Sequence, residues 1–380
     1  MIYVIGAIIG LLASFYKKEK SVFALILLYA FTIYSFNSSN PDLVNYQNQY
    51  IGNFFGFNEP VYIGLVYLSQ TLGLNFWVFR AAIAAIGLCL IGKTIYDYSP
   101  YPNINMFLFV LYPLIIDVVQ IRFFLAYSII VYSIRFILNY RDKRKISDIV
   151  KFFIALFLAT GTHYSAVMYI ILVVLMLNVE KRKTLVYVIV PITIILIFTN
   201  LPSVAGIASS FLVQRKVNRW ILGEKNTTAL NILRILVTRL SILFVLSLFV
   251  IMRRKRTIIP ESSTKVSFRR KDISMNKYLS QNRLLFLATL YTELFCFLEI
   301  VVASEYERLT RPALVWGGIL ASRLLYRMEK NHRYICTLIW ILLIVFYFLS
   351  QMLFQGVRYT NLKYFEYVFR EVMENNLLYK

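Results

Sequence analysis

His163 is one of two histidines in a chain of 380 residues, and it lies in an unusual setting. The stretch FLATGTHYSAVMYI places it beside Gly161, Thr162 and Ser165, inside a run that is otherwise apolar. An imidazole exchanges protons near neutral pH, so a histidine among small polar residues is a candidate for acid or base chemistry. The alternative interpretation is a histidine whose ring only completes a helix turn.

Arginines form the second group of residues that could act on a substrate. Their planar guanidinium groups bind phosphate oxygens through two parallel hydrogen bonds, which suits a pyrophosphate ligand. The candidates for such contacts are Arg80, Arg122, Arg215, Arg219, Arg308 and Arg311.

Several of these arginines also have a simpler explanation. Arg122 could form a structural ion pair with Asp117, which precedes it closely in the sequence. Arg308 and Arg311 could pair with the acidic residues of 305–307. Polar groups inside a membrane are costly unless they are used, which favours a functional role for those that lie there.

The amino-terminal third contributes acidic and aromatic candidates. Asp42, Tyr46 and Tyr50 lie in NPDLVNYQNQY, and Glu59 immediately precedes Pro60. Asp42 and Glu59 could equally be ordinary loop carboxylates. They gain a role only where the fold brings them to the side of the molecule that holds the arginines.

The composition indicates whether these residues lie in a water-soluble protein or in a membrane protein. Hydrophobic residues make up 59% of the chain and charged residues 16%, and the apolar residues come in long runs. This pattern indicates an all-α polytopic membrane protein, because helices satisfy their backbone groups inside lipid. The net charge of +22 comes in short basic blocks between apolar runs, which are typical of cytoplasmic anchors and not of a nucleic-acid surface. The three cysteines lie in apolar runs, so neither a disulfide nor a metal site is expected.

The basic blocks define the predicted topology. Placing the blocks near 17–20, 141–145, 181–183, 253–271 and 327–333 in the cytoplasm gives about twelve spans. The candidate spans are 1–16, 21–36, 76–97, 104–120, 122–139, 149–161, 164–179, 184–199, 231–252, 283–303, 312–327 and 334–354.

Two segments must turn or re-enter to keep this topology. The blocks on both sides of 149–179 are cytoplasmic, so the chain must reverse at 160–165, which puts His163 near the outer face. By the same argument 59–75 cannot span. We expect a re-entrant or interfacial helix there, starting at Pro60 because proline suits the first helical position.

The expected organisation is a single transmembrane domain over 1–354. Its outer loops are 37–75 and 200–230, and the second carries Arg215 and Arg219, which could instead bind anionic lipid headgroups. The basic, Ser-rich loop 253–282 is expected to be cytoplasmic and mobile. An amphipathic interfacial helix is expected over 355–380, where apolar and aromatic residues recur at helical spacing.

The order of the motifs resembles that of a known family. NPDLVNYQNQY, EPVYIGLVYLSQTLGLNFWVFR, IRFFLAYSIIVYSIRF, THYSAVMYI and EYERLTRPALVW look like successive signatures of the EpsG family, the Wzy-like polymerases of bacterial exopolysaccharides. The resemblance covers residues 37–320. One departure is Phe123, because family members often carry a polar residue directly after the first arginine.

The resemblance implies a glycosyltransferase of the GT-C type in the bacterial plasma membrane, with its active site facing outside. Its substrate would be an oligosaccharide repeat unit on a polyprenyl diphosphate, and the growing glycan would pass as a block to a hydroxyl of the next unit. Membrane lipid and a chain-length-regulating protein are the further partners expected. No nucleic acid, cofactor or metal is expected.

The resemblance also implies roles for individual residues. Charge on the departing diphosphate would be stabilised by Arg122, Arg308 and Arg311. The group that takes the proton of the acceptor hydroxyl would be His163, Asp42 or Glu59. Sugar rings would be bound by Tyr46 and Tyr50.

Other functions would use the same residue types. Another lipid-linked glycosyltransferase, or an enzyme like the O-antigen ligases, would differ only in its acceptor. A glycolipid flippase or another transporter would show internal repeats and charges along a path through both leaflets. We find no internal repeat, and the candidates gather on one predicted side.

Overall fold

The computed structural model describes residues 18–37, 42–52, 59–176, 229–254, 265–301 and 304–354. Within these ranges the chain forms helices and no strand, as its apolar composition predicts. The long helices are α2 (Lys20–Phe36), α5 (Phe76–Tyr98), α8 (Ile121–Lys143), α9 (Ile146–Thr162), α12 (Ala229–Arg254), α13 (Lys265–Glu293), α15 (Arg311–Tyr326) and α16 (Lys330–Phe354). The short ones are α3 (Leu43–Gly52), α4 (Pro60–Thr71), α6 (Pro102–Leu111), α7 (Leu114–Asp117), α14 (Cys296–Val301) and the 3₁₀ helices η1 (Tyr164–Met176) and η2 (Ser304–Thr310).

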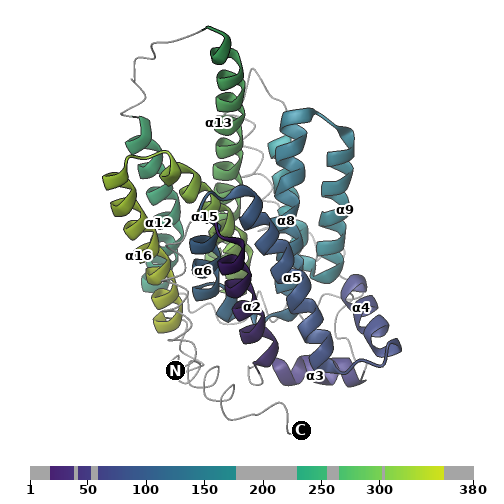
Figure 1. The fold of residues 1–380 in the computed structure, drawn as a ribbon. Helices are drawn as coiled ribbons and strands as arrows, with labels where there is room; N and C mark the ends of the chain where they lie inside the picture. The colour runs from purple at the N-terminus through teal and green to yellow at the C-terminus, as the bar shows by residue number, and fades with distance from the viewer. Residues whose placement is uncertain are drawn as a thin grey trace.

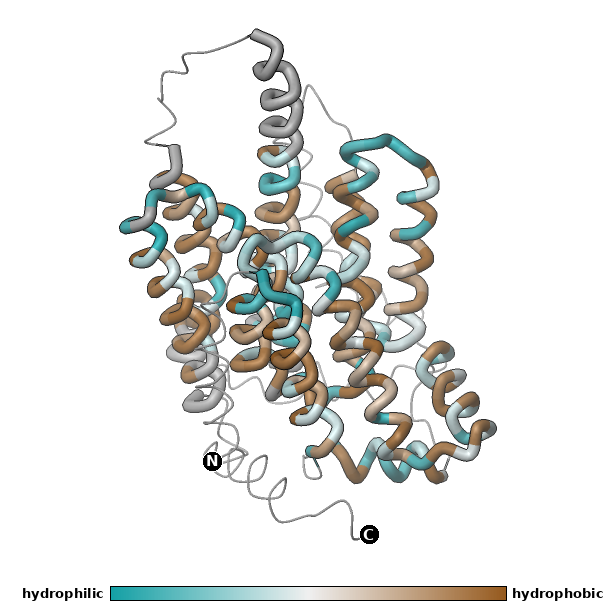
Figure 2. The backbone as a smooth tube through the Cα atoms, in the orientation of Figure 1, coloured by the Kyte–Doolittle hydropathy of each residue, from teal (hydrophilic) through white to brown (hydrophobic). Residues whose placement is uncertain are grey.

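The long helices pack side by side into a bundle (Figure 1). Helix α8 contacts α5 and α9, and α15 contacts α12, α13 and α16. The short helices α3 and α4 lie at the lower end in Figure 1, where α4 packs against α9. The α8–α9 connection lies at the opposite end, and Figure 2 shows that it is hydrophilic while the helix that follows is mostly hydrophobic.

Two helices of the described part, α5 and α8, are long and apolar enough to cross a membrane. Apolar helical stretches of 10–17 residues occur at Lys20–Phe36, Pro102–Leu111, Tyr164–Met176, Ile235–Ile251 and Asn331–Tyr347. The full set of about twelve spans stays a prediction. The predicted spans 1–16 and 184–199, the loop 200–230 up to residue 228 and the tail 355–380 lie outside the described residues.

Local sequence explains several helix boundaries. Asn75 caps α5, because its side chain accepts a hydrogen bond from the backbone N–H of Val78 at 3.0 Å. Helix α4 begins at Pro60, as the sequence predicts. Helix α9 ends at Thr162, and η1 packs back against it, so the helix break predicted at 160–165 is present.

The structure corrects four expectations about continuous elements. The predicted span 104–120 is broken, because α6 ends at Leu111 before Pro113, and the short α7 follows. The span 283–303 is broken as well: α13 ends at Glu293 and α14 starts at Cys296. The outer loop 37–75 contains a second helix, α3, besides the expected helix that starts at Pro60. The loop 253–282 is helical from Lys265 onward, because α13 starts there.

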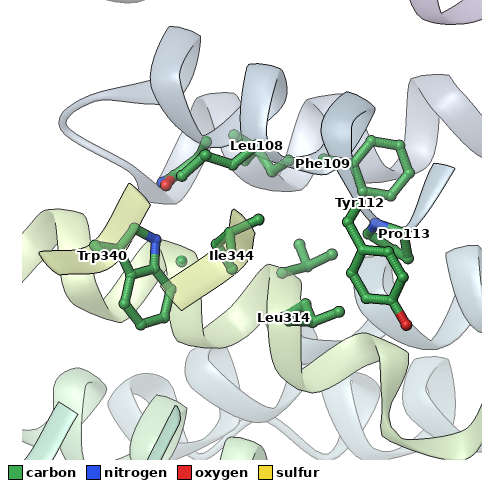
Figure 3. A pocket seen from close by; sticks show the side chains of 11 residues that line it. Leu108, Phe109, Tyr112, Pro113, Leu314, Trp340 and Ile344 are labelled. Atoms are coloured by element: carbon green, nitrogen blue, oxygen red, sulfur yellow. The ribbon is translucent and has the colours of Figure 1, made fainter. Parts of the chain in front are cut away.

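A small cavity between α6, α15 and α16 is too small for a sugar. Its volume is about 20 Å³, enough for about one water. Figure 3 shows its lining, in which the side chains of the α6 region face α15 and α16: Leu108, Phe109, Tyr112, Pro113, Leu314, Trp340 and Ile344. None of the predicted site residues lines this cavity.

Candidate functional site

Arg122 and Glu59 form an ion pair that joins two elements remote in sequence. Arg122 lies in the first turn of α8, and its Nη1 donates to Oε2 of Glu59, directly before α4, at 2.5 Å. The side chain of Glu59 is 4% exposed and that of Arg122 is 17% exposed. The pair therefore fastens α8 to α4 while part of the guanidinium group stays accessible. The alternative prediction, an ion pair of Arg122 with Asp117, is wrong.

Aromatic rings and a backbone donor surround this ion pair. The guanidinium carbon of Arg122 lies 5.5 Å from the ring centroid of Tyr46 and 5.9 Å from that of Tyr62, within the range of cation–π attraction. Oε1 of Glu59 accepts a hydrogen bond from the backbone N–H of Tyr164 at 3.3 Å, which ties the start of η1 to α4. Tyr62 was not predicted as a site residue. Its place about one helical turn after Glu59 is the signal that could have found it.

Tyr46 connects the ion pair to Asp42. The backbone N–H of Tyr46 donates to the carbonyl oxygen of Asp42 at 3.0 Å, at the start of α3. Burial raises the pKa of the Tyr46 hydroxyl, Arg122 nearby lowers it, and the charge of Asp42 raises it further. The balance is upward, so Tyr46 stays protonated at neutral pH and can donate a hydrogen bond. The two opposing charges also show that Asp42 and Arg122 act electrostatically on the same ring.

Tyr50, in the same helix, holds α3 in place. Its hydroxyl donates to the carbonyl oxygen of Leu74 at 2.6 Å and lies 3.0 Å from Oγ of Ser69. Its ring packs against Phe76 and Phe79, with centroids 5.8 and 5.3 Å away. These contacts tie α3 to α4 and α5. A contact between Tyr50 and a sugar stays a prediction.

Phe123 is the point at which the other candidates meet. The imidazole ring of His163 lies 5.5 Å from the Phe123 ring, centroid to centroid, with an interplanar angle of 88°. The guanidinium carbons of Arg308 and Arg311 lie 5.9 and 5.5 Å from the centroid of the same ring. One apolar side chain at the start of α8 thus brings together the α9–η1 turn, η2 and the start of α15. The sequence indicated Phe123 only as a departure from a family pattern.

His163 is held by the residue two positions after it. Its Nδ1 accepts a hydrogen bond from the backbone N–H of Ser165 at 3.3 Å and lies 2.8 Å from Oγ of Ser165. Because a backbone N–H can only donate, Nδ1 carries no proton, and the proton of the neutral imidazole is on Nε2. In this tautomer His163 presents an N–H donor at Nε2.

Gly161 allows α9 to approach α4 closely. A Cβ atom added at Gly161 would lie 2.5 Å from Cγ2 of Val61, which is far below a van der Waals contact. Val61 stands in the first turn of α4, next to Glu59 and Pro60. The glycine of the THYS stretch therefore helps to set the position of Glu59 relative to the α9–η1 turn.

Asp117 and Arg311 form a second ion pair, which is fully buried. Nη1 of Arg311 donates to Oδ1 of Asp117 at 2.7 Å, and the Tyr127 hydroxyl donates to Oδ2. Asp117 is 0% exposed and Arg311 is 2% exposed. The charge of Arg311 is therefore largely balanced inside the protein. Arg308, by contrast, is only partly buried.

The segment η2, which carries Arg308, is anchored from three sides. The Tyr169 hydroxyl of η1 donates to the carbonyl oxygen of Leu309 at 3.0 Å. The Tyr112 hydroxyl donates to Oε1 of Glu307 at 3.3 Å, and Nη2 of Arg239 lies 3.5 Å from the same oxygen. These contacts fix the backbone on both sides of Arg308.

Arg239 of α12 contacts several of the elements around η2, and it is 1% exposed. Besides Glu307 it contacts Glu299 of α14, with Nη2 3.4 Å from Oε2. Its guanidinium carbon lies 5.4 Å from the ring centroid of Tyr347, whose hydroxyl lies 3.5 Å from Oε1 of the buried Glu293. Arg239 is not among the arginines that the sequence analysis singled out. Its contacts show that it connects α12, α14, η2 and α16.

Arg80 is engaged in contacts with other parts of the chain. It is 0% exposed, its Nη1 donates to the carbonyl oxygen of Asn37, and its Nη2 lies 3.5 Å from Oδ1 of the same residue. Its guanidinium carbon lies 5.6 Å from the ring of Tyr34 and 5.9 Å from that of Trp77. Arg80 thus fastens the end of α2 to α5, and its contact with a substrate stays a prediction. The other two predicted ligands, Arg215 and Arg219, lie outside the described residues.

These features define a class of protein, a helical membrane protein with a cluster of arginines, tyrosines and one histidine at its helix ends. The chain belongs to the EpsG family, whose family model matches residues 20–369. No curated protein and no solved structure matches the chain. The family match confirms the resemblance found in the order of the motifs. It indicates a polysaccharide polymerase that acts on lipid-linked oligosaccharides.

Proposed function

We propose that the protein joins oligosaccharide repeat units carried on a polyprenyl diphosphate, by block transfer of the growing glycan at the outer face of the plasma membrane. The observation that carries this proposal is the meeting of His163, Arg308 and Arg311 on the ring of Phe123, with Arg122 as its chain neighbour. The match to the EpsG family supports the class of reaction.

The three arginines would have different roles, because they differ in how far they are buried. Arg308 is partly exposed, so it is the guanidinium group best placed to contact a diphosphate. Arg122 keeps part of its surface accessible beside Glu59 and would contribute a second contact. Arg311 is balanced by Asp117 and would support the site through its charge and its packing on Phe123. The cations, and not a metal, would stabilise the charge of the leaving group.

His163 would donate a proton or a hydrogen bond. Its Nε2–H suits an oxygen of the diphosphate or of a sugar, because Nδ1 already accepts from Ser165. Glu59 is engaged by Arg122 and by the backbone of Tyr164, so it would hold Arg122 in position. The group that accepts the proton from the attacking hydroxyl would then be Asp42, which is partly exposed and acts on Tyr46.

These groups account for every bond, electron pair and proton in the transfer step. An oxygen of the acceptor hydroxyl forms a bond to the anomeric carbon of the growing glycan, and the bond from that carbon to the diphosphate oxygen breaks. The electron pair of the broken bond stays on the diphosphate, where the arginines stabilise it. The proton of the hydroxyl passes to the carboxylate. A single displacement of this kind inverts the configuration at the anomeric carbon.

The sidedness of the proposal comes from the basic connections. The 141–145 and 327–333 blocks lie at the ends of α8 and α15, whereas the site lies at the opposite ends of the same two helices. Under the positive-inside rule the basic ends are cytoplasmic, and the site then faces outside. The proposed site and the lipid-borne substrate would thus meet on the same side of the membrane.

A reconstituted assay tests the proposal. Purified protein in liposomes receives lipid-linked repeat units as the sole glycan, and the products are separated by length. Long polymers from the intact protein, with single repeat units remaining for Arg308→Ala at equal abundance, support the proposal. Transfer of one unit to an acceptor that is not lipid-linked would favour a ligase. Polymers of unchanged length and yield from both Arg308→Ala and Arg122→Ala would contradict the proposed site.

A further inference from the structure

An apolar groove lies between α2, α5 and α8, away from the candidate site. Its volume is about 460 Å³, within the range of about 300–1,000 Å³ that is common for ligand pockets. Its apolar wall consists of Phe23 and Leu27 from α2 and Leu90 from α5, and Cys89 lines it as well. The groove lies near the first turns of α2 and the last turns of α5, so it belongs to the end of the bundle that is predicted to be cytoplasmic.

Three cations form a rim along this groove. Nζ of Lys18 lies 4.6 Å from the ring centroid of Tyr96, and Cζ of Arg135 lies 3.7 Å from that of Tyr132. Both tyrosine rings line the groove. Lys93 lines it directly, and its side chain is 59% exposed. We call these three basic residues the cationic rim.

In the described part of the chain, the three cations of the cationic rim outnumber the carboxylate that pairs with them. Asp97 is paired with Lys93 at 2.9 Å and with Arg135 at 3.3 Å, so one carboxylate serves two cations. The third cation, Lys18, is followed by Glu19 and Lys20, whose charges offset each other. The excess of positive charge stands beside an apolar wall, which is the arrangement that complements an anionic headgroup on an acyl chain.

We propose that this groove binds an anionic phospholipid of the cytoplasmic leaflet, with an acyl chain along the apolar wall and the phosphate at the cationic rim. Basic pockets between transmembrane helices on the cytoplasmic side recognise anionic headgroups. Lysine side chains at such a depth extend toward the headgroups while their methylene stems cover apolar surface. A soluble polyanion would satisfy the rim but would leave the apolar wall exposed. The site does not depend on the proposed polymerase function.

Cys89 provides a built-in reporter for the test. It is the exposed one of the three cysteines, whereas Cys296 and Cys336 are buried, so replacing those two by serine leaves a single labelling position in the groove. The labelled full-length protein, carrying bimane at Cys89, is placed in phosphatidylcholine vesicles. One series of vesicles contains increasing fractions of phosphatidylglycerol with brominated acyl chains. The other series contains increasing fractions of phosphatidylcholine with brominated acyl chains. Bromine quenches bimane only at contact range, so quenching reports which lipid occupies the groove.

We expect brominated phosphatidylglycerol to reach half-maximal quenching at a lower mole fraction than brominated phosphatidylcholine. Lys93→Gln and Lys18→Gln should each reduce this preference roughly fivefold, the factor that corresponds to about one surface cation. Lys93→Arg should keep it. The matched control is Lys151→Gln, an exposed lysine of α9 near the same end of the bundle, which should change nothing.

Three results would overturn the proposal. Equal quenching curves for the two lipids would mean that the groove holds any acyl chain without regard to charge. Absence of quenching by either lipid would mean that protein covers the groove. A preference for phosphatidylglycerol that survives the double substitution of Lys18 and Lys93 would likewise refute the role of the cationic rim. All the substituted lysines are exposed, so elution of the variants as single symmetric peaks is expected and checks that they fold.

Discussion

Glu59 accepts a hydrogen bond from Arg122 at 2.5 Å across a gap of 63 residues in the sequence. The carboxylate comes from the residue before α4, and the guanidinium group comes from the first turn of α8. Both side chains are largely buried, and each neutralises the charge of the other. The same pair also presents the accessible part of Arg122 to the candidate site.

A double-substitution experiment separates these two roles. Glu59→Gln removes the carboxylate that pairs with the largely buried guanidinium group of Arg122, and we expect it to lower the free energy of unfolding by on the order of 3 kcal/mol. Adding Arg122→Met should restore much of this stability, because both charges are then gone, while polymer formation should stay absent. Thermal unfolding in detergent and the length assay provide the two measurements. Recovery of activity together with stability in the double variant would show that Arg122 has no role beyond the pair.

Among the arginines of the candidate site, Arg308 should be the one whose guanidinium group matters most for the rate of transfer. We expect Arg308→Ala to lower the rate of transfer by about 10²–10³-fold, as removal of a donor to a developing charge does. Arg308→Lys should recover only part of the rate, because an ammonium group cannot bind two oxygens in parallel. Arg283→Lys, at an exposed position on α13, is the control and should leave the rate unchanged. A fully active Arg308→Lys variant would contradict bidentate binding of the diphosphate.

The tautomer of His163 leads to a discriminating pair of variants. If Nε2–H donates a hydrogen bond, His163→Gln keeps a donor group and should retain a measurable part of the rate, whereas His163→Phe should lose it by about 10²-fold or more. If the imidazole instead acts as the base, glutamine should be as inactive as phenylalanine. Single-turnover rates of transfer provide the comparison. Ser165→Ala should have a smaller effect, because it removes one of the two contacts that fix Nδ1.

Gly161 and Val61 should show a compensating interaction. Gly161→Ala places a methyl group against Val61, and we expect a loss of about 1–3 kcal/mol of stability from this overpacking. Val61→Ala in the same chain should recover most of that loss, because it removes the Cγ2 atom at 2.5 Å from the new Cβ. Unfolding temperatures of the three variants test this relation. Equal losses for Gly161→Ala with and without Val61→Ala would show that α9 and α4 do not meet here.

Opposite effects are expected at the two ends of the Arg239 network. Arg239→Met leaves Glu299 and Glu307 buried without their cation, which should cost about 3–5 kcal/mol. Glu293→Gln should be nearly neutral or stabilising, because Oε2 of Glu293 has no hydrogen-bond partner among the described residues. Thermal unfolding of both variants is the measurement. A strongly destabilised Glu293→Gln variant would show that this carboxylate is needed in its charged form.

The long helices could be predicted because their signals are local. The apolar run at 76–97 corresponds to α5, which has a capping asparagine directly before it, and the run at 312–327 corresponds to α15. The beginning of α4 followed from a single proline. The break before α7 was missed because hydropathy ignores Pro113, although a proline interrupts a helix whatever its neighbours. The start of α13 was missed because its first turns are polar, and hydropathy says nothing about polar helices.

The pairing of the site residues could not be predicted in the same way. Sequence spacing suggested that Arg122 pairs with the nearby Asp117, but in the fold Asp117 faces Arg311 and Arg122 faces Glu59. Which helices are neighbours decides these pairs, and one sequence does not contain that information. The sequence could single out candidate residues, because charged groups inside apolar runs are few, and their role in a site stays a prediction. Their partners required the packing of α4, α7 and α15 around the start of α8.

The size of the Phe123 side chain should also influence a length. Its ring lies near the imidazole of His163 and near the guanidinium groups of Arg308 and Arg311, so we expect its size to affect the span between the imidazole and these cations. A leucine or a tryptophan at this position would shorten or lengthen that span without removing any of the polar groups. In the proposed site, the side chain at this position would therefore limit how far apart the diphosphate and the sugar next to it can bind.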